Sequence, residues 1–325
     1  MPSYNQGAFI AEAIESVLLQ ECDFVFKLLI FDDASTDNSI EICNDFVRRY
    51  PAKIQLFSND TNLGLIKNYI KAFNACSAKY IAILEADDYW VDRQKLTKQV
   101  AVLEENSNVG LVHARPKVLS NNGFRVDYNV KGNDNQGIKL FEDLLLGKYS
   151  ISPLTVMFRR DLLFEIDFEI CVSQKFQTID LFLWLDFVLR TNIYFLNDVV
   201  GVYRYLNNSV SNTYNFEKRD SFIKSSIAIV DYYINKYSVT ESSVKLIKNK
   251  QQAILLHNAF IFNNKSKIKE YFFSLKCSDI DSTFLFLFAC HPVFNNLYHS
   301  RRKLLRLLST IKQKFNQIVS YQDGI

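Results

Sequence analysis

Residues 79–90 read KYIAILEADDYW. Ile81–Leu84 form a short, continuous apolar run, which is typical of a strand buried on both faces. The run ends on three acidic residues, Glu85, Asp87 and Asp88. A buried strand that ends in carboxylates predicts an α/β domain with an acidic group at one edge of its sheet.

A second strand with the same ending lies earlier in the chain. Residues 27–37 read KLLIFDDASTD, so the apolar run Leu28–Phe31 is followed by Asp32 and Asp33. Short strands alternate with amphipathic helical patterns over residues 9–119, which predicts a parallel sheet with right-handed crossovers. Ligands of such sheets bind at the carboxyl ends of the strands. We therefore expect both acidic groups at the ligand-binding edge.

The composition is that of a globular protein. The chain has 325 residues, 48% of them hydrophobic and 22% charged, so it can bury a large core. Its net charge of +3 gives no indication of a nucleic-acid partner. Six scattered cysteines without a C-x-x-C pair predict reduced thiols in a cytoplasmic protein. No apolar run is long enough to span a bilayer.

The character of the sequence changes near residue 215. Long helical patterns follow, such as FIKSSIAIVDYYINKY at residues 222–237, and they lack strands that end in acids. We predict an α/β domain over residues 1–214, which carries the chemistry, and a helical extension over residues 215–325.

The acids at residues 85–88 predict a metal site. Clustered carboxylates repel one another and raise each other's pKa unless a cation or hydrogen-bond donors neutralise them. Oxygen ligands on one short loop suit Mg²⁺ or Mn²⁺, which complete their shells with phosphate oxygens and water. The alternative is that these acids lie only in a solvated turn and that the earlier pair, Asp32 and Asp33, belongs only to a helix N-cap.

Five segments in this order resemble one enzyme family: MPSYN, DDASTD, NLG, KYIAILEADDYW and VYRYLNNSVS. Residues 1–213 are similar to the inverting nucleotide-sugar glycosyltransferases of family 2, which have the GT-A fold. The resemblance implies a mixed, mostly parallel sheet flanked by helices. It also implies a nucleotide-sugar donor, most often a UDP-sugar, and a glycan or lipid-linked acceptor, as in cell-surface polysaccharide synthesis.

The resemblance also implies the nucleotide-binding residues. Four of these residues match the family's turn that lies along the nucleoside: Pro2, Ser3, Tyr4 and Asn5. Asp33, with Asp32 beside it, matches the acid that hydrogen-bonds the base. Lys67 and Asn68 follow the turn at Gly64, where they would either approach the nucleotide or only cap and solvate a helix.

The run at residues 85–88 matches the family's D-x-D position. The resemblance implies that Asp87 is a metal ligand, that Glu85 contacts the ribose or the donor sugar, and that Asp88 is a second ligand or a sugar contact. Many members have aspartate where this chain has Glu85, whose longer side chain reaches further.

An inverting transfer needs a base that removes the proton of the acceptor hydroxyl. In QTIDLFLWLDFVLR, at residues 177–190, Asp180 takes the place of the family's base, with Asp186 as a fallback and a plain helix N-cap as the alternative. Arg204 matches a family arginine that faces the diphosphate or the acceptor, although an arginine at a strand edge is more often a surface ion-pair partner.

Three further residues are best interpreted as core residues: His113, Trp90 and Trp184. The segment 284–315 is basic and contains an amphipathic pattern. This pattern fits either peripheral contact with the inner face of a membrane or packing on the domain, and both alternatives stay open.

Two competing functions remain at this stage. A nucleotidyltransferase would favour a basic, glycine-rich phosphate loop, whereas SYNQGAF at residues 3–9 has one glycine and no lysine or arginine. A non-catalytic glycan-assembly scaffold would lack metal-dependent nucleotide binding. Met1 matches the last residue of the family's first strand, so we expect that the strand is truncated here.

Overall fold

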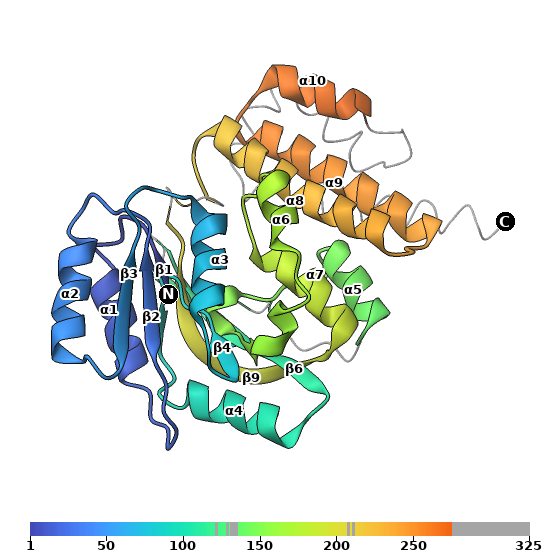
Figure 1. Ribbon diagram of the computed structural model, residues 1–325. Helices are drawn as coiled ribbons and strands as arrows, with labels where there is room; N and C mark the ends of the chain where they lie inside the picture. Colours follow the sequence, from blue (N-terminus) through green and yellow to red (C-terminus); the bar gives the residue numbers. More distant parts are fainter. Residues whose placement is uncertain (121–122, 128–129, 131–135, 207–208, 210–211, 275–325) are drawn as a thin grey trace. The chain divides into compact units, whose positions relative to one another are not determined.

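The structure is a computed structural model that describes the chain except for residues 121–122, 128–129, 131–135, 207–208, 210–211 and 275–325 (Figure 1). The chain divides into two compact units, Met1–Val244 and Lys245–Ile325. Every site residue predicted above lies in the first unit.

The first sheet is parallel and has the strand order β1-β2-β3. It consists of β1 (Pro2–Ser3), β2 (Leu28–Asp32) and β3 (Ile54–Ser58). Figure 1 shows α1 and α2 on one side of these strands and α3 on the other. The predicted alternation of strands and helices is confirmed in this part of the chain, where Asp32 is the last residue of β2.

The second sheet is mixed and has the order β4-β8-β6-β9-β5, with β7 paired to β6. Its strands are β4 (Tyr80–Ala82), β5 (Tyr89–Trp90), β6 (Val109–Ser120), β7 (Gly123–Val126), β8 (Met157–Arg159) and β9 (Asn192–Arg204). Only β6 and β9 run parallel among the described pairs of this sheet. The N–H of Ala86 donates to the carbonyl of Pro2 at 3.3 Å, so the acidic loop joins the two sheets.

Most of the helices fall in the first unit, where they cover the sheets. These are α1 (Ile10–Leu18), α2 (Ser39–Arg49), α3 (Leu65–Ala75), α4 (Lys95–Glu105), α5 (Ile138–Leu145), α6 (Phe168–Ser173), α7 (Asp180–Arg190) and α8 (Phe216–Lys236). Short 3₁₀ turns lie at Pro153–Thr155 and Arg160–Leu163. In α1, Ile10 and Ile14 are fully buried on the same face, which is the packing that their spacing predicts.

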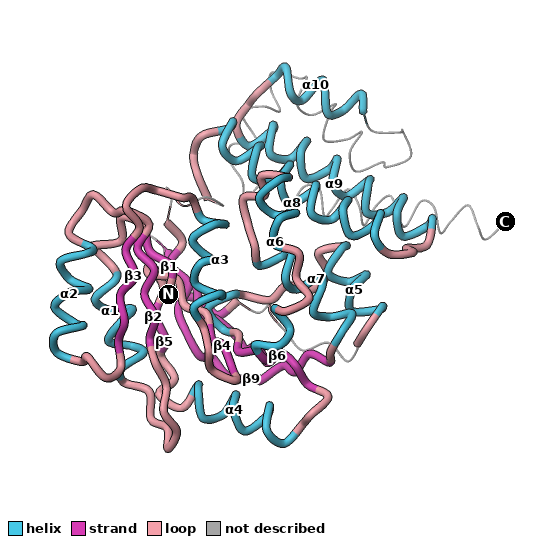
Figure 2. Tube along the Cα trace, in the orientation of Figure 1, coloured by secondary structure: helices cyan, strands magenta, loops and turns pink. Residues whose placement is uncertain are grey.

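From α8 onward the described chain is helical, as Figure 2 shows. Asn215 caps α8 by accepting the N–H of Lys218 at 2.9 Å, and Tyr233 of α8 donates from its hydroxyl to the carbonyl of Phe182 at 2.9 Å. This first helix therefore belongs to the same compact unit as the sheets, and the predicted boundary at residue 215 marks the start of α8, whereas the units divide after Val244.

The second unit contains most of α9 (Glu241–Ile261) and α10 (Lys265–Ser274). Asn264 begins α10 by accepting the N–H of Lys267 at 3.2 Å. Among the described residues, no helix combines the length and the hydropathy that crossing a bilayer requires. The basic segment 284–315 lies outside the described residues.

The core of the first unit contains one unusual group, the side chain of Lys95, which is 0% exposed. Its ammonium lies 4.3 Å from the centre of the Trp90 ring and donates to Gln99 Oε1 at 2.6 Å and to the Val156 carbonyl at 3.3 Å. Burial lowers the pKa of Lys95 from 10.5 to about 7 because the charged form loses its hydration.

Lys95 predicts a pH dependence of stability. Between pH 7 and 10.5 the unfolded chain binds this proton and the folded chain does not, so stability rises with pH across that window. We expect Lys95→Met to reduce this rise by about 1–3 kcal/mol between pH 7 and 9, measured by urea unfolding at both pH values. The exposed Lys139→Met is the matched control, and an equal slope in Lys95→Met and wild type would contradict the prediction.

Candidate active site

The acidic loop after β4 gathers three carboxylates. Glu85, Asp87 and Asp88 each offer an oxygen, and these oxygens all lie within 4.8 Å of one another. Asp88 is 1% exposed, and the other two are partly buried. The Asp87 carboxylate accepts no hydrogen bond from any other described residue, and only its own backbone N–H is directed at it. Carboxylates at this spacing form a donor set that fits Mg²⁺ or Mn²⁺.

Two donors hold the loop from opposite sides. Tyr69 of α3, itself buried, donates from its hydroxyl to Glu85 Oε1 at 2.8 Å. Arg204, the last residue of β9, donates from its backbone N–H to Asp88 Oδ1 at 2.8 Å and from its guanidinium to the Asp87 carbonyl at 2.5 Å. The loop is thus fixed by one helix and one strand that are distant in sequence.

The side chain of Arg204 is almost fully enclosed, at 7% exposure for the residue. Its guanidinium also pairs with Glu12 and lies 4.5 Å and 5.0 Å from the ring centres of Tyr89 and Phe9. Arg204 thus forms the ion pair that the alternative expected, but it does so from a buried position and not at the surface. Its contacts with the loop give it a supporting role there.

Burial and mutual repulsion raise the pKa values of the acids. Burial, followed by the charge of Asp87, raises the pKa of Glu85 from 4.5 to about 7. Burial also raises the pKa of Asp87, and it raises the pKa of Asp88 well above its ordinary value with help from both neighbours. A cation would relieve this cost, because it attracts the charged form of each acid.

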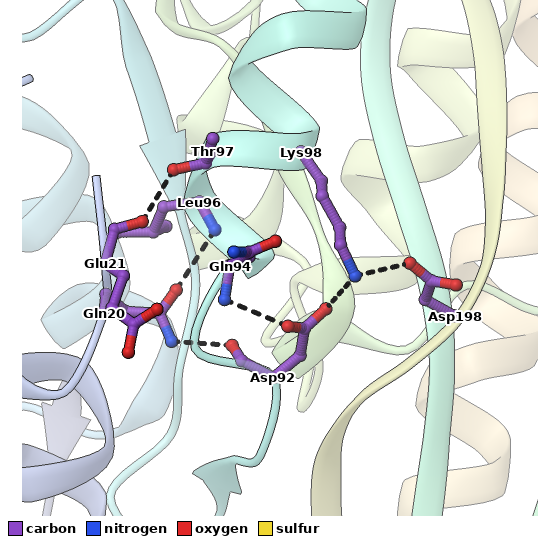
Figure 3. A network of polar contacts seen from close by, with 8 residues as sticks. All are labelled: Gln20, Glu21, Asp92, Gln94, Leu96, Thr97, Lys98 and Asp198. Atoms are coloured by element: carbon purple, nitrogen blue, oxygen red, sulfur yellow. Dashed lines mark hydrogen bonds and ion pairs between the residues drawn. The ribbon is translucent and has the colours of Figure 1, made fainter. Parts of the chain in front are cut away.

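A polar network anchors the chain that follows the loop (Figure 3). Lys98 of α4 bridges Asp92 and Asp198 of β9 at 2.8 Å each. Gln20, just beyond α1, donates to the Asp92 carbonyl at 2.8 Å and accepts the N–H of Leu96 at 3.1 Å. These contacts fix the path from the acidic loop into α4.

Asp33 holds the loop between β3 and α3 through several hydrogen bonds. It is 3% exposed, and it accepts Asn59 Nδ2 and the N–H of Leu63 at 2.8 Å and the N–H of Gly64 at 2.9 Å. Asp32 is 0% exposed and accepts the N–H of Ser35 at 2.8 Å. Both acids therefore hold the loops that surround the predicted nucleobase site, in addition to any contact they make with a nucleobase.

The turn at residues 2–5 is tied to the loop after β2. The N–H of Asn5 donates to Ser35 Oγ, and Asn5 Oδ1 accepts the N–H of Thr36, both at 2.8 Å. Pro2 and Ser3 are buried, and Tyr4 is 46% exposed. Ser3 Oγ is buried without a hydrogen-bond partner among the described residues. The turn thus presents a hydroxyl and an aromatic ring at the edge of β1.

Asp180 lies near the acidic loop. Its charge contributes to the raised pKa values of Glu85 and Tyr69. It is the first residue of α7, and the N-cap is Ile179, so the plain N-cap interpretation is wrong. Asp180 Oδ1 accepts from Thr178 Oγ1 and from the N–H of Leu181, and the carboxylate also accepts its own backbone N–H. Burial raises the pKa of Asp180, which favours proton uptake.

The fallback base does not fit. Asp186 is 5% exposed and pairs with Arg190 one turn further along α7. Lys236 of α8 approaches the other carboxylate oxygen at 4.0 Å. An acid enclosed by two cations is a structural ion pair, so Asp180 is the better candidate.

The two candidates on α3 separate. Asn68 is 3% exposed and donates to the carbonyl of Phe31 at 2.9 Å, so it holds α3 against β2. Lys67 is exposed and lines a cavity beside α6. The contacts of Asn68 are therefore structural. The ammonium of Lys67 forms no ion pair with the described residues, so it remains available to a ligand.

Three core interpretations are confirmed. His113 is 0% exposed and bonds through Nε2 to the hydroxyl of Tyr149. The indole N–H groups of Trp90 and Trp184 donate to the carbonyls of Leu154 at 2.8 Å and Ile151 at 3.2 Å. Both indole N–H groups are paired, whereas His113 is bonded only through Nε2 and its buried Nδ1 has no partner among the described residues.

Sequence reasoning missed Tyr69. It lies in the helix LIKNYIKAFNA of α3, where its spacing marks it only as a core residue. No local signal connects it with Glu85, sixteen positions further along the chain. The support that Arg204 gives to Asp87 and Asp88 was missed for the same reason.

Comparisons with known proteins agree with this geometry. A family model described as glycosyl transferase family 2 matches residues 1–164. An uncharacterised protein of Mycobacterium tuberculosis is 28% identical over 202 residues, which cover 62% of this chain and 56% of that protein. The chain thus spans little more than half the length of these relatives.

Two relatives have names that state a process. The Escherichia coli protein WfgD, named UDP-Glc:alpha-D-GlcNAc-diphosphoundecaprenol beta-1,3-glucosyltransferase, is 28% identical over 243 residues, 72% of this chain and 89% of WfgD. The Bacillus subtilis protein TuaG, named for teichuronic acid biosynthesis, is 27% identical over 224 residues, 68% of this chain and 84% of TuaG.

Solved structures show the same fold. A crystal structure of TarS from S. aureus has a TM-score of 0.55 at 18% identity and covers 89% of this chain and 79% of that one. The mannosyltransferase PcManGT from Pyrobaculum calidifontis, solved with GDP-Man and Mn²⁺, has a TM-score of 0.54 at 15% identity and covers 94% and 83%. The predicted GT-A fold is confirmed.

The acidic loop predicts metal-dependent stability with a defined sign. Burial raises the pKa of Glu85 to about 7, so protons compete with a cation for this carboxylate below pH 7. Without metal, the folded chain binds this proton more tightly than the unfolded chain does, so the contribution of Glu85 to stability falls as pH rises from 4.5 to 7. We expect Mn²⁺ to raise the melting temperature more at pH 8 than at pH 6, measured by thermal denaturation. Asp87→Asn should lose most of this shift, and the exposed Asp23→Asn should keep it. Equal shifts in Asp87→Asn and wild type would contradict the metal site.

Proposed function

Because the chain belongs to glycosyl transferase family 2, we propose that it transfers a sugar, with inversion, from a UDP-sugar to a hydroxyl of a glycan or lipid-linked acceptor. The observation that carries the proposal is the grouping of Glu85, Asp87 and Asp88, with Asp180 near enough for its charge to raise the pKa of Glu85. Several of their oxygens have no protein donor, as a site for a cation and a proton transfer requires.

The nucleoside would lie along the turn Pro2–Asn5. The unpartnered Ser3 Oγ and the exposed ring of Tyr4 support this placement, because both offer contacts that a ribose or a base can use. Asp33 holds the facing loop and retains acceptor capacity for a base N–H. Lys67 would approach the nucleotide only at the periphery of this site.

Asp87 and Asp88 would hold Mg²⁺ or Mn²⁺, and Glu85 would contact the ribose or the donor sugar. The bound metal would neutralise the diphosphate leaving group as its bond to carbon breaks. Tyr69 and Arg204 keep the acids in place, so that little reorganisation is needed during the reaction.

Asp180 would act as the base. Its Oδ2, which accepts neither the Thr178 nor the Leu181 bond, would take the proton of the acceptor hydroxyl as the hydroxyl oxygen forms a bond to the anomeric carbon and the diphosphate departs. The hydrogen bonds of Thr178 and Leu181 to Oδ1 orient the carboxylate, and its raised pKa helps it to hold the proton.

The names of WfgD and TuaG support a role in cell-surface polysaccharide synthesis. A lipid-linked acceptor would place the protein on the cytoplasmic face of the membrane, with peripheral contact through residues 284–315. A non-catalytic scaffold predicts no Mn²⁺-dependent binding of UDP, which calorimetry tests. A nucleotidyltransferase predicts no sugar transfer from a UDP-sugar, which a transfer assay tests.

Asp180→Asn tests the mechanism. The amide keeps an Oδ1 acceptor for Thr178 and Leu181 but cannot take a proton, so we expect kcat for transfer to fall by roughly 10²–10⁴ while the Kd for UDP with Mn²⁺ stays within about twofold. Asp186→Asn, which weakens the pair with Arg190, should lower stability and leave kcat of the folded protein within about threefold. Wild-type turnover in Asp180→Asn would refute the assignment of the base.

A further inference from the structure

The cavity between the start of α3 and the end of α6 is lined by only one of the candidate site residues, Lys67. We propose that it binds the diphosphate and the first part of the hydrocarbon chain of a lipid-linked acceptor. This inference rests on the proposed function, and it adds the location and chemistry of the acceptor site.

The cavity has a volume of about 330 Å³ and two walls. One wall is the segment 63–67 at the start of α3, and the other runs from Cys171 to Gln177 at the end of α6. Most of its lining is apolar, with Leu63 and Leu65 on one side and Val172 and Phe176 on the other. No acidic residue lines it, in contrast to the four acids of the candidate active site.

Two lysines supply its charge. Lys67 and Lys175 both line the cavity, one from each wall, and both are exposed to solvent. Neither forms an ion pair with the described residues, whereas Lys98 and Arg190 of the same unit are paired with acids. Two unpaired cations above an apolar surface are complementary to a ligand with an anionic head and a hydrocarbon chain.

The backbone at Lys175 adds an independent observation. Lys175 has φ = 53° and ends α6 in a Schellman arrangement, in which its N–H donates to Val172 at 3.1 Å and the N–H of Phe176 donates to Cys171 at 3.0 Å. Glycine adopts this conformation without steric cost, and a lysine does not. These bonds fix the backbone at Lys175, so that the residue is held in the wall of the cavity.

The cavity lies next to the active site in the chain without being part of it. Gly64 of one wall donates to Asp33 Oδ2 at 2.9 Å, and the other wall ends at Gln177, three positions before Asp180. None of the residues 2–5, 32–33 or 85–88 lines it. One wall of the cavity is therefore bonded to Asp33, and the other wall leads along the chain into the segment of the candidate base.

A UDP diphosphate has the same anionic chemistry, and the apolar lining distinguishes the two sources. UDP carries no hydrocarbon chain for the surfaces of Leu63, Leu65, Val172 and Phe176. An isoprenoid diphosphate uses both the lysines and these side chains, so it fits the cavity better than inorganic diphosphate or UDP does.

The test measures the binding of farnesyl diphosphate to the full chain saturated with UDP and Mn²⁺, by calorimetry. We expect farnesyl diphosphate to bind at least tenfold more tightly than inorganic diphosphate. Lys175→Glu and Lys67→Glu should each weaken its binding by about tenfold or more, because each removes a charge-assisted contact. Lys139→Glu, an exposed substitution on α5 away from the cavity, should leave it within twofold.

Lys175→Gly separates function from folding. Glycine relieves the backbone conformation, so the melting temperature should stay equal or rise while farnesyl diphosphate binding falls. UDP binding to Lys175→Gly should stay within twofold of wild type.

The inference is overturned if farnesyl diphosphate does not bind, if UDP displaces it, or if Lys175→Gly binds it as tightly as wild type does. A protein that binds UDP with Mn²⁺ and transfers sugar but fails these tests keeps the proposed function and loses only the acceptor site. A protein that passes them but shows no sugar transfer loses the proposed function and keeps the site.

Discussion

Repulsion between the buried carboxylates at the end of β4 is the constraint on which the rest of the site depends. Three acids within 4.8 Å of one another destabilise the fold unless donors or a cation compensate. Tyr69 and Arg204 compensate in part, and each comes from a different element of the fold. The need to hold this loop explains why an enclosed arginine ends β9 and why a tyrosine hydroxyl on α3 points at the loop.

The other two acids, Asp32 and Asp33, hold the backbone of neighbouring loops. Asp32 and Asp33 accept N–H groups from Ser35, Leu63 and Gly64, so their charges are compensated within the protein. These bonds join the end of β2 to the start of α3, which also carries Tyr69. One helix, α3, therefore contacts both the loop beside the predicted nucleobase site and the loop beside the predicted metal site.

The sequence predicted what depends on local pattern. The strand that ends at Asp32 was predicted correctly, since its apolar run and carboxylates are visible in one segment. The prediction for Glu85 was only partly correct, because β4 is short and half-buried and ends at Ala82, before the acids. The antiparallel partners of β8, the length of β9 and the place of Arg204 were not predictable, because they depend on pairing between distant segments. The surface alternative for Arg204 failed because exposure is a property of the whole fold.

Backbone conformation gives the last connection between stability and function. In the described part of the first unit, three non-glycine residues have positive φ: Asn5, Ala34 and Lys175. Asn5 and Ala34 belong to the two loops that frame the predicted nucleoside site, and Lys175 lines the cavity beside α6. Strained residues persist only where surrounding bonds fix them, as Asn5 is fixed by Ser35 and Thr36. The strain therefore falls on the loops that would meet ligands, whereas the strands and helices that hold those loops are regular.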